Sequence, residues 1–599
     1  MAPVFAVQKG KNAEKAVLFQ DAYSTAEHKI QLTYSQLISV SQNRSHIQSR
    51  ENERLAKMRF ILKLIRLLHK QHKQSRKTDE HSQSNEESTQ ALSQNLKKNL
   101  DTVKTRFGDS SDLIIREFSF GRDKEREIKA ALIFLDGMIN LSMINDNIIK
   151  PLMHGSQLFL AEETADISSM DEIRDTLLAV GEVKTVYTYN EMIEACLSGN
   201  AVLIAEGFCK ALDIGAKGWE KRAVTEPTSE TAIRGPREGF TENLRTNTSL
   251  IRRKIKNPAL KIRATVIGKR THTQVNILYM GGIADPDLVS EVERRLKKID
   301  TDAVLATGYL EEYIEDSPST AFPTIWCSEK PDAIAGKLLE GRVAIVVDGS
   351  PFVMSVPMLF VENFQTAEDY ITRSHYATMV RILRLIAFII SLFTPALYIA
   401  LTTYHQELIP TTLLFTMAAS SEGVPFPAAV EMGIMMLVFE ILREAGIRMP
   451  RAVGQTISIV GALVMGEAAV QAGIVGAPVV IIIAITAVSS FAIPFASDAI
   501  SLLRWFLLIM ATTMGSFGIT IGAFIILVHL TSLRSFGAHY LAPLAPFQKA
   551  DLKDTVVRAP LWAMRTRPQE ISPQDLKRQN FKIPYHPSAG GGSNRSEEP

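Results

Sequence analysis

The chain has few cysteines and none of the familiar catalytic signatures. Its 599 residues include three cysteines, Cys196, Cys209 and Cys327, and no CxxC pair. The sequence therefore predicts neither a disulfide framework nor a cysteine-based metal site. It also contains no Walker sequence, no GxGxxG after a strand, no HExxH and no GxSxG. We predict that the chain is not an enzyme, with no catalytic, cofactor-binding or metal-binding residues.

Excess charge is also missing. The formal net charge is +2, which gives no general electrostatic reason to expect nucleic acid as a partner. The first residues, MAPVFAVQKGKNAEK, lack an apolar core of signal-peptide length. We therefore expect the front of the protein to stay in the cytoplasm.

Long apolar runs are scarce before residue 382 and dense from 382 to 533. This split predicts an α+β multidomain protein: a cytoplasmic front of two α/β subdomains, a polytopic α-helical membrane domain and a short cytoplasmic tail. The expected parts are a variable N-terminus with a basic amphipathic helix and a polar linker (1–95), subdomain 1 (96–225), a basic connector (226–260), subdomain 2 (261–376), the membrane domain (377–533), the tail (534–577) and a disordered end (578–599).

Residues 51–73 place apolar side chains on one helical stripe and Lys and Arg around it. Such a helix can lie on an anionic membrane surface. Packing against a neighbouring domain or subunit is the alternative.

The front shows an ordinary mixture of strand and helix patterns. In subdomain 1, residues 103–114 suggest helix, 128–135 a buried strand, and 200–215 a possible hairpin. In subdomain 2, strands at 262–267 and 274–280 are followed by two helices, which is typical of a βαβ-type fold.

The connector between the subdomains is dense in charge of both signs. We interpret it as a salt-bridged segment that docks two subdomains or subunits, and a phosphate or anion site is the alternative. The candidate docking residues are Arg234, Arg237, Arg252 and Arg253.

The membrane domain contains five apolar segments, near 382–403, 408–442, 454–473, 477–496 and 501–533. Basic residues before the first segment and along the tail favour cytoplasmic positions for both termini. Both termini on one side require an even number of crossings. One of the two long segments therefore crosses twice or is re-entrant, with a break at SSEGVPFP (420–427) or near Gly515, Gly518 and Gly522.

Charged residues and prolines around the SSEGVPFP break are candidates for gating or for contact with a partner, because interruptions of this kind are costly in lipid. Interfacial positions, or structural pairing of the glutamates with nearby arginines, are the alternatives. These candidates are Glu422, Pro425, Pro427, Glu431, Glu440, Arg443 and Glu444.

Glu467 is the one charge between Arg451 and Asp498. Residues that share its helical face could line a pore in an oligomer, since apolar rings gate by dewetting and carboxylate rings favour cations. A buried glutamate bonded to a neighbouring helix is the alternative. The candidate pore-lining residues are Val460, Val464, Glu467, Val470, Gln471 and Ile474.

Several long motifs resemble the A subunit of GerA-type nutrient germinant receptors of endospore-forming bacteria. They include EPTSETAIRGPREGFTE (226–242), SLIRRKIKNP (249–258), EGVPFPAAVEMGIMMLVFEILREAGIRMP (422–450) and VGQTISIVGALVMGEAAVQAGIVGAP (453–478). The resemblance covers roughly residues 100 to 570.

This resemblance implies a receptor subunit in the spore inner membrane with a transporter-like B subunit and a lipoprotein C subunit as partners. It also implies a homo-oligomer, proposed to be a pentamer, that forms a nutrient-gated channel for monovalent cations. A secondary transporter and a membrane scaffold of a signalling complex remain as alternatives. The sequence shows no internal repeat of the kind that many transporters have.

Overall fold

The computed structural model describes residues 90–108, 110–121, 127–155, 169–218, 227, 230, 234–448, 466–493, 496–572 and 575–579. The predicted basic helix at 51–73, the pore candidates Val460 and Val464, and residues 580–599 of the expected disordered end lie outside the described residues. Every contact given below lies within the unit that begins at Ala91.

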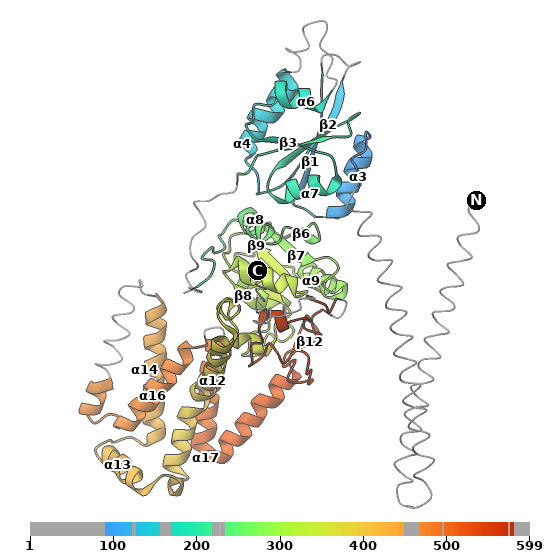
Figure 1. Ribbon diagram of the computed structural model, residues 1–599. Helices are drawn as coiled ribbons and strands as arrows, with labels where there is room; N and C mark the ends of the chain where they lie inside the picture. Colours follow the sequence, from blue (N-terminus) through green and yellow to red (C-terminus); the bar gives the residue numbers. More distant parts are fainter. Residues whose placement is uncertain are drawn as a thin grey trace, which may run out of the picture. The chain divides into compact units, whose positions relative to one another are not determined.

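Subdomain 1 is an antiparallel sheet with helices on both faces (Figure 1). Its strand order is β1-β2-β4-β5-β3. The strands are β1 (Leu113–Phe120), β2 (Ile128–Leu135), β3 (Val183–Val186), β4 (Ala201–Ala205) and β5 (Ala211–Ile214). Helices α3 (Leu96–Phe107) and α7 (Tyr189–Leu197) cover one face. The other is covered by α4 (Leu141–Ile144), the π-helices η1 (Asn145–Ile149), η2 (Pro151–Gly155) and η3 (Ile173–Leu177), and the short α6 (Met170–Glu172).

The buried strand predicted at 128–135 is β2. Its alternate residues enter two cores, since Ile133 packs under α3 and α7 while Leu132 packs on the opposite face. A strand covered on both faces shows a continuous apolar run rather than an alternating pattern. The predicted hairpin at 200–215 is also confirmed, because β4 and β5 pair antiparallel.

The helix suggested over 103–114 is wrong at its C-terminal end. Helix α3 stops at Phe107, and Gly108 follows it with a φ of 62°. The chain then enters β1, which pairs with β2 along its whole length. The apolar residues Leu113 and Ile114 therefore belong to a strand, since glycine at positive φ ends the helix before them.

Subdomain 2 is a second antiparallel sheet with the order β6-β7-β9-β10-β8. Its strands are β6 (Leu260–Ile267), β7 (Thr273–Met280), β8 (Trp326–Ser328), β9 (Val343–Val347) and β10 (Val353–Val356). Helices α9 (Pro286–Lys298) and α10 (Thr307–Ile314) cover one face. Helices α8 (Leu244–Lys254) and α11 (Pro331–Leu339) cover the other.

The expected βαβ-type arrangement is wrong, because each strand pair described in this sheet is antiparallel. The chain runs from β7 through α9, α10, β8 and α11 before it reaches β9. It enters β9 in the direction opposite to β7, so the two strands pair antiparallel. Strand β8 has three residues, which is too short to produce a periodic signal in the sequence.

The apolar domain consists of α12 (Ser374–Thr403), α13 (Thr411–Ser421), α14 (Ala428–Arg448), α16 (Ala477–Phe491) and α17 (Ser497–Ser532). Helices α12 and α17 are long and apolar enough to cross a membrane. The 3₁₀ turns η4 (Phe360–Phe364) and η5 (Ala367–Tyr370) lead from subdomain 2 into α12, and η6 (Gln406–Leu408) follows α12. The core that α8 and α11 form with the sheet continues without interruption into α12 and α17.

The predicted tail returns to subdomain 2. Its strands β11 (Arg534–Ser535) and β12 (Ala538–His539) form a small hairpin, and the turn η8 (Leu561–Ala563) follows. The Tyr540 hydroxyl donates to the Pro323 carbonyl at 2.8 Å, and the Ser572 hydroxyl donates to the Ile283 carbonyl at 2.8 Å. Both ends of the apolar domain are therefore attached to the same subdomain.

Candidate gating and pore elements of the apolar domain

The break predicted at SSEGVPFP is present. Helix α13 ends at Ser421 and α14 begins at Ala428. Pro425 and Pro427 lie in the turn between them, where the missing N–H of proline removes no helical hydrogen bond. The Pro427 carbonyl accepts from the Val430 amide at 2.8 Å, which starts the first turn of α14. Glu422 caps the end of α13 and is exposed.

Glu431, in the first turn of α14, is 3% exposed. Its Oε2 accepts a hydrogen bond of 2.7 Å from the amide of Gly476, the residue that caps the N-terminus of α16. A helix N-terminus stabilises a carboxylate by about 0.3–1 kcal/mol, and by up to ~2 kcal/mol in favourable partly buried cases. The effective penalty for burying an ion is several kcal/mol, so this one contact offsets a small part of it.

The described part of the predicted pore face covers residues 466–474. Glu467, Gln471 and Ile474 are exposed on this chain, and Val470 is half-buried. The Gln471 side-chain amide donates to Glu467 Oε1 at 3.1 Å, one helical turn away. Gly473 has a φ of 64° and ends the helical segment. These four pore candidates thus lie together beside the turn that Glu431 contacts.

Glu440 lies at the centre of a cluster that joins three helices. Arg443, one turn further along α14, approaches its Oε2 at 2.9 Å. Ser501 on α17 donates to its Oε1. Arg504, also on α17, lies 3.6 Å from that oxygen. The local pairing of Glu440 with an arginine was one of the sequence alternatives, and this contact is present, while Glu444 lies exposed one residue after Arg443.

Arg504 is a residue that the sequence interpretation missed. It is 1% exposed. Its Nε donates to the Ser391 carbonyl at 3.0 Å and its Nη2 donates to the Ser391 hydroxyl at 3.0 Å, both on α12. Its guanidinium also lies 5.9 Å from the ring centroid of Phe439. An arginine inside an apolar run was the available signal, because such residues need a buried partner.

Helix α17 is a hairpin of two limbs rather than one rod. Gly515 has φ 61° and ψ −139°, which breaks the helix there. A Cβ on Gly518 would lie 2.0 Å from the Met510 carbonyl oxygen, and one on Gly522 would lie 2.7 Å from Leu507. The residues in each of these two pairs are eight or more positions apart, too far to touch in a straight helix. The chain therefore folds back on itself. The three glycines therefore form the turn and the seam between the limbs.

The two ends of this hairpin are fixed by polar contacts. At the turn, the Tyr404 hydroxyl at the end of α12 donates to the Thr512 carbonyl at 2.7 Å. At the other end, His529 Nε2 lies 2.9 Å from the Thr320 hydroxyl of subdomain 2. The second limb thus returns to the side on which α12 begins.

Buried ion pairs fix the beginning of α12 against subdomain 2 and the tail. Arg381 is 1% exposed, and its Nε pairs with Asp369 at 2.9 Å while its Nη1 pairs with Asp554 of the tail at 2.8 Å. Arg384 pairs with the same Asp369 at 3.0 Å. Burial raises the pKa of Asp554, although the charge of Arg381 opposes this rise.

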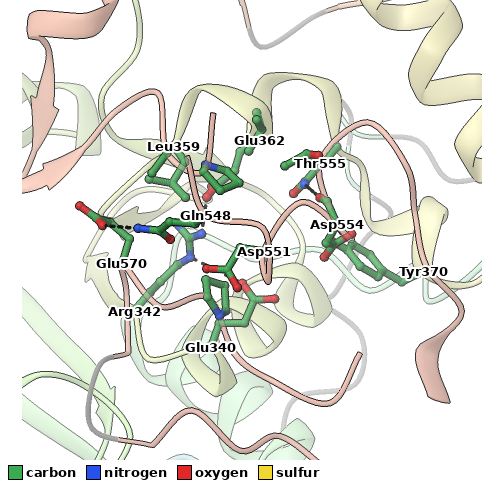
Figure 2. Close-up of a pocket in the computed structure, with 15 residues that line it drawn as sticks. Glu340, Arg342, Leu359, Glu362, Tyr370, Gln548, Asp551, Asp554, Thr555 and Glu570 are labelled. Atoms are coloured by element: carbon green, nitrogen blue, oxygen red, sulfur yellow. Dashed lines mark hydrogen bonds and ion pairs between the residues drawn. The ribbon is translucent and has the colours of Figure 1, made fainter. Parts of the chain in front are cut away.

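A small cavity of about 50 Å³ lies beside this cluster, between subdomain 2 and the tail. Figure 2 shows residues that line it, among them Arg342 and Glu362 from subdomain 2 and Gln548 and Glu570 from the tail. Gln548 donates to Glu570 at 3.0 Å. A volume of this size fits a few water molecules rather than a nutrient, since ligand pockets usually measure about 300–1,000 Å³.

The connector arginines make different contacts. Arg252 is buried, and it forms a two-bond contact with Asp112 of subdomain 1, from Nε at 3.0 Å and from Nη2 at 2.9 Å. Arg253 pairs with Glu238 at 3.2 Å. The Arg234 amide donates to Glu368 at 3.2 Å, and Arg237 is exposed.

Glu230 of the connector lies in a group of carboxylates around β8. It accepts from the Ser328 hydroxyl at 3.0 Å, and burial raises its pKa. Glu311 of α10 lies 3.7 Å from the Cys327 thiol. Burial, together with the negative charge of Glu315, raises the pKa of Glu311 to about 7.

We predict that Glu311 makes the front less stable as the pH rises. The folded protein keeps the Glu311 proton up to about pH 7 and the unfolded chain releases it near 4.5. The contribution of Glu311 to the free energy of unfolding is thus complete below pH 4.5 and is lost as the pH rises through 7. This loss is at most about 3 kcal/mol. In Glu311→Gln, the unfolding midpoint should depend less on pH between pH 4.5 and 7. An unchanged pH profile would contradict the assignment.

We also predict that Arg504→Met lowers the stability of the purified chain in detergent by about 3–5 kcal/mol, because removing one member of a buried polar cluster leaves its partners unpaired. Arg504→Lys keeps the charge but loses the paired hydrogen bonds to Ser391, so an intermediate effect is expected. Leu502→Ala, at a position that is 63% exposed on the same helix, serves as the control. Equal unfolding midpoints for Arg504→Met and Leu502→Ala would argue against a stabilising cluster.

Comparisons of the chain with known proteins all find spore germination proteins. The family described as Bacillus/Clostridium GerA spore germination protein matches residues 101–570. Spore germination protein KA of Bacillus subtilis (strain 168) is 45% identical over 503 residues, which cover 84% of this chain and 91% of that protein. Spore germination protein GerLA of Bacillus cereus is 38% identical over 486 residues, covering 81% and 97%.

A crystal structure of the N-terminal domain of the A subunit of the Bacillus megaterium spore germinant receptor GerK3 is also similar. It is 34% identical, with a TM-score of 0.36, and the match covers 45% of this chain and 97% of that one. The family match spans most of the chain and agrees with the extent of the resemblance in the sequence. The chain belongs to the GerA family of spore germination proteins.

Proposed function

We propose that this chain is the A subunit of a nutrient germinant receptor and that it forms a homo-oligomeric, pentameric channel for monovalent cations in the spore inner membrane. A transporter-like B subunit and a lipoprotein C subunit are its partners, and nutrient binding opens the channel to start germination. Membership of the GerA family and relatives named as spore germination proteins support the receptor role.

The observation that carries the channel proposal is the exposed face of residues 467–474. Glu467 and Gln471 are polar and exposed within an apolar domain. A polar face is costly against lipid, so it belongs against water or another subunit. In a ring of subunits, Glu467 attracts cations, while Val470 and Ile474 form an apolar constriction below it.

The α17 hairpin supports a topology with both termini in the cytoplasm. Each limb has about 17–18 residues, roughly 26 Å at 1.5 Å per residue, which is close to the length needed to cross. Counting α17 as two crossings turns the odd number of apolar segments into an even number. The contact of His529 with Thr320 supports the same direction of return.

A secondary transporter, with its substrate at the α13–α14 break, is the second candidate. The break supports it, because broken helices form the binding sites of many transporters. The missing internal repeat argues against it. A membrane scaffold is favoured if purified oligomers conduct no ions.

We predict that Glu467→Ala lowers cation flux several-fold in liposomes that contain the purified receptor, because the carboxylate no longer concentrates cations. Val470→Ala should instead raise the basal leak, because it removes apolar bulk from the constriction. Glu407→Ala, which removes a 72% exposed carboxylate after α12, is the control and should behave as wild type. Wild-type flux in both face variants would remove the pore assignment.

A further inference from the structure

Glu431 is a buried carboxylate without a cationic partner among the described residues. It is 3% exposed and lies against an apolar cluster that contains Ile399, Met432 and Val475. The Gly476 amide is the hydrogen-bond donor to it. One amide at a helix N-terminus does not offset the desolvation of a full negative charge. A further positively charged group is therefore needed to offset the desolvation of the Glu431 carboxylate.

Two neutral oxygen atoms lie close to the 473–476 turn that contacts this carboxylate. Glu431 Oε2 and Ser421 Oγ lie 3.5 Å and 3.6 Å from the position that a Cβ on Gly476 would take. The Gly423 carbonyl oxygen lies 3.2 Å from the corresponding position on Gly473. The Ser421 hydroxyl donates its proton to the Met417 carbonyl at 3.0 Å, so its oxygen lone pairs remain available to a cation.

The position of these groups in the fold also favours a cation. Ser421 is the last residue of α13, so the partly negative C-terminal end of that helix points at the break. The turn at 473–476 lies on the other side, and glycine at position 473, where φ is 64°, lets this turn approach the Gly423 carbonyl. Unwound backbone and helix C-termini coordinate small monovalent cations in other membrane proteins.

The charge of the site sets the class of cation. Among the described residues, no three Asp, Glu, His or Cys side chains come together in a way that could hold a metal ion. One carboxylate and two neutral oxygens balance a single positive charge rather than a double one. We propose that Glu431, with Ser421 and the backbone oxygen of Gly423, forms a binding site for a monovalent cation such as Na⁺ or K⁺.

The site connects the α13–α14 break to the end of the helical segment that bears Glu467. A cation there would hold the 473–476 turn against the break, because Ser421 lies beside Gly476 and Gly423 lies beside Gly473. This binding function goes beyond the proposed channel and does not require it: a site of this kind exists equally in a transporter or a scaffold.

The test is thermal unfolding of the purified full chain in detergent, in NaCl or KCl against N-methyl-D-glucamine chloride at the same ionic strength. A bound cation raises the unfolding midpoint, and the rise grows with cation concentration. We expect a rise of several degrees in wild type and its loss in Glu431→Gln. The matched control is Glu422→Gln, which changes an exposed carboxylate at the same break and should keep the rise.

Ser421→Ala provides a second variant, because Ser421 is exposed and its substitution should not disturb folding. It should shift the midpoint titration to several-fold higher cation concentration while leaving the midpoint in N-methyl-D-glucamine unchanged. No cation dependence in wild type would overturn the proposal. A rise that persists in Glu431→Gln or is unaltered in Ser421→Ala would also overturn it. If wild type conducts no ions in liposomes but its unfolding midpoint still rises with cation concentration, the channel proposal is contradicted and the cation site is not.

Discussion

The apolar domain depends on the pairing of charges that it carries away from water. In a medium of low dielectric constant an unpaired charge costs several kcal/mol, so each charge constrains the helices around it. Arg504 holds α17 against Ser391 of α12, and Glu440 brings α14 to both. Glu431 holds the start of α14 against the turn before α16. The helices are thus joined at a few polar points within a surface of ordinary apolar packing.

The same principle explains how the front and the apolar domain are joined. Arg381 and Arg384 pair with Asp369 of η5, and Arg381 also reaches Asp554 of the tail. Around them, Phe360 and Phe364 pack edge-to-face with Phe388 of α12. A displacement of subdomain 2 would therefore act on α12 and on the exit of α17 together. This gives a physical route by which an event at the front could change the arrangement of the apolar helices.

Local features of the sequence predicted local features of the structure. The split between mixed and apolar halves, the break at 420–427, and a glycine break in the last long segment all follow from composition and periodicity. The Glu440–Arg443 contact is within one helical turn, so spacing alone suggests it. For the break in α17, the sequence offered three glycines, and the structure selects Gly515 for the turn and uses Gly518 and Gly522 for close packing.

Partners that are distant in sequence could not be predicted in this way. Arg504 and Ser391 are 113 residues apart, and Arg252 and Asp112 are 140 apart. Strand direction in subdomain 2 was predicted wrongly, because helix and strand patterns do not specify the direction in which a connection returns. The contacts of the tail with subdomain 2 were also invisible, since the tail consists of turns with little periodicity. The pore face itself remains a prediction, because half of its apolar residues lie outside the described chain.

The central claim is that residues 467–474 face a shared axis in an assembly of several copies. The most direct measurement is the oligomeric state of the purified protein in detergent, followed by imaging of the particle. The account predicts a closed ring in which Glu467 and Val470 of each copy line a central path. A stable monomer, or a ring in which this face lies against lipid, would contradict it.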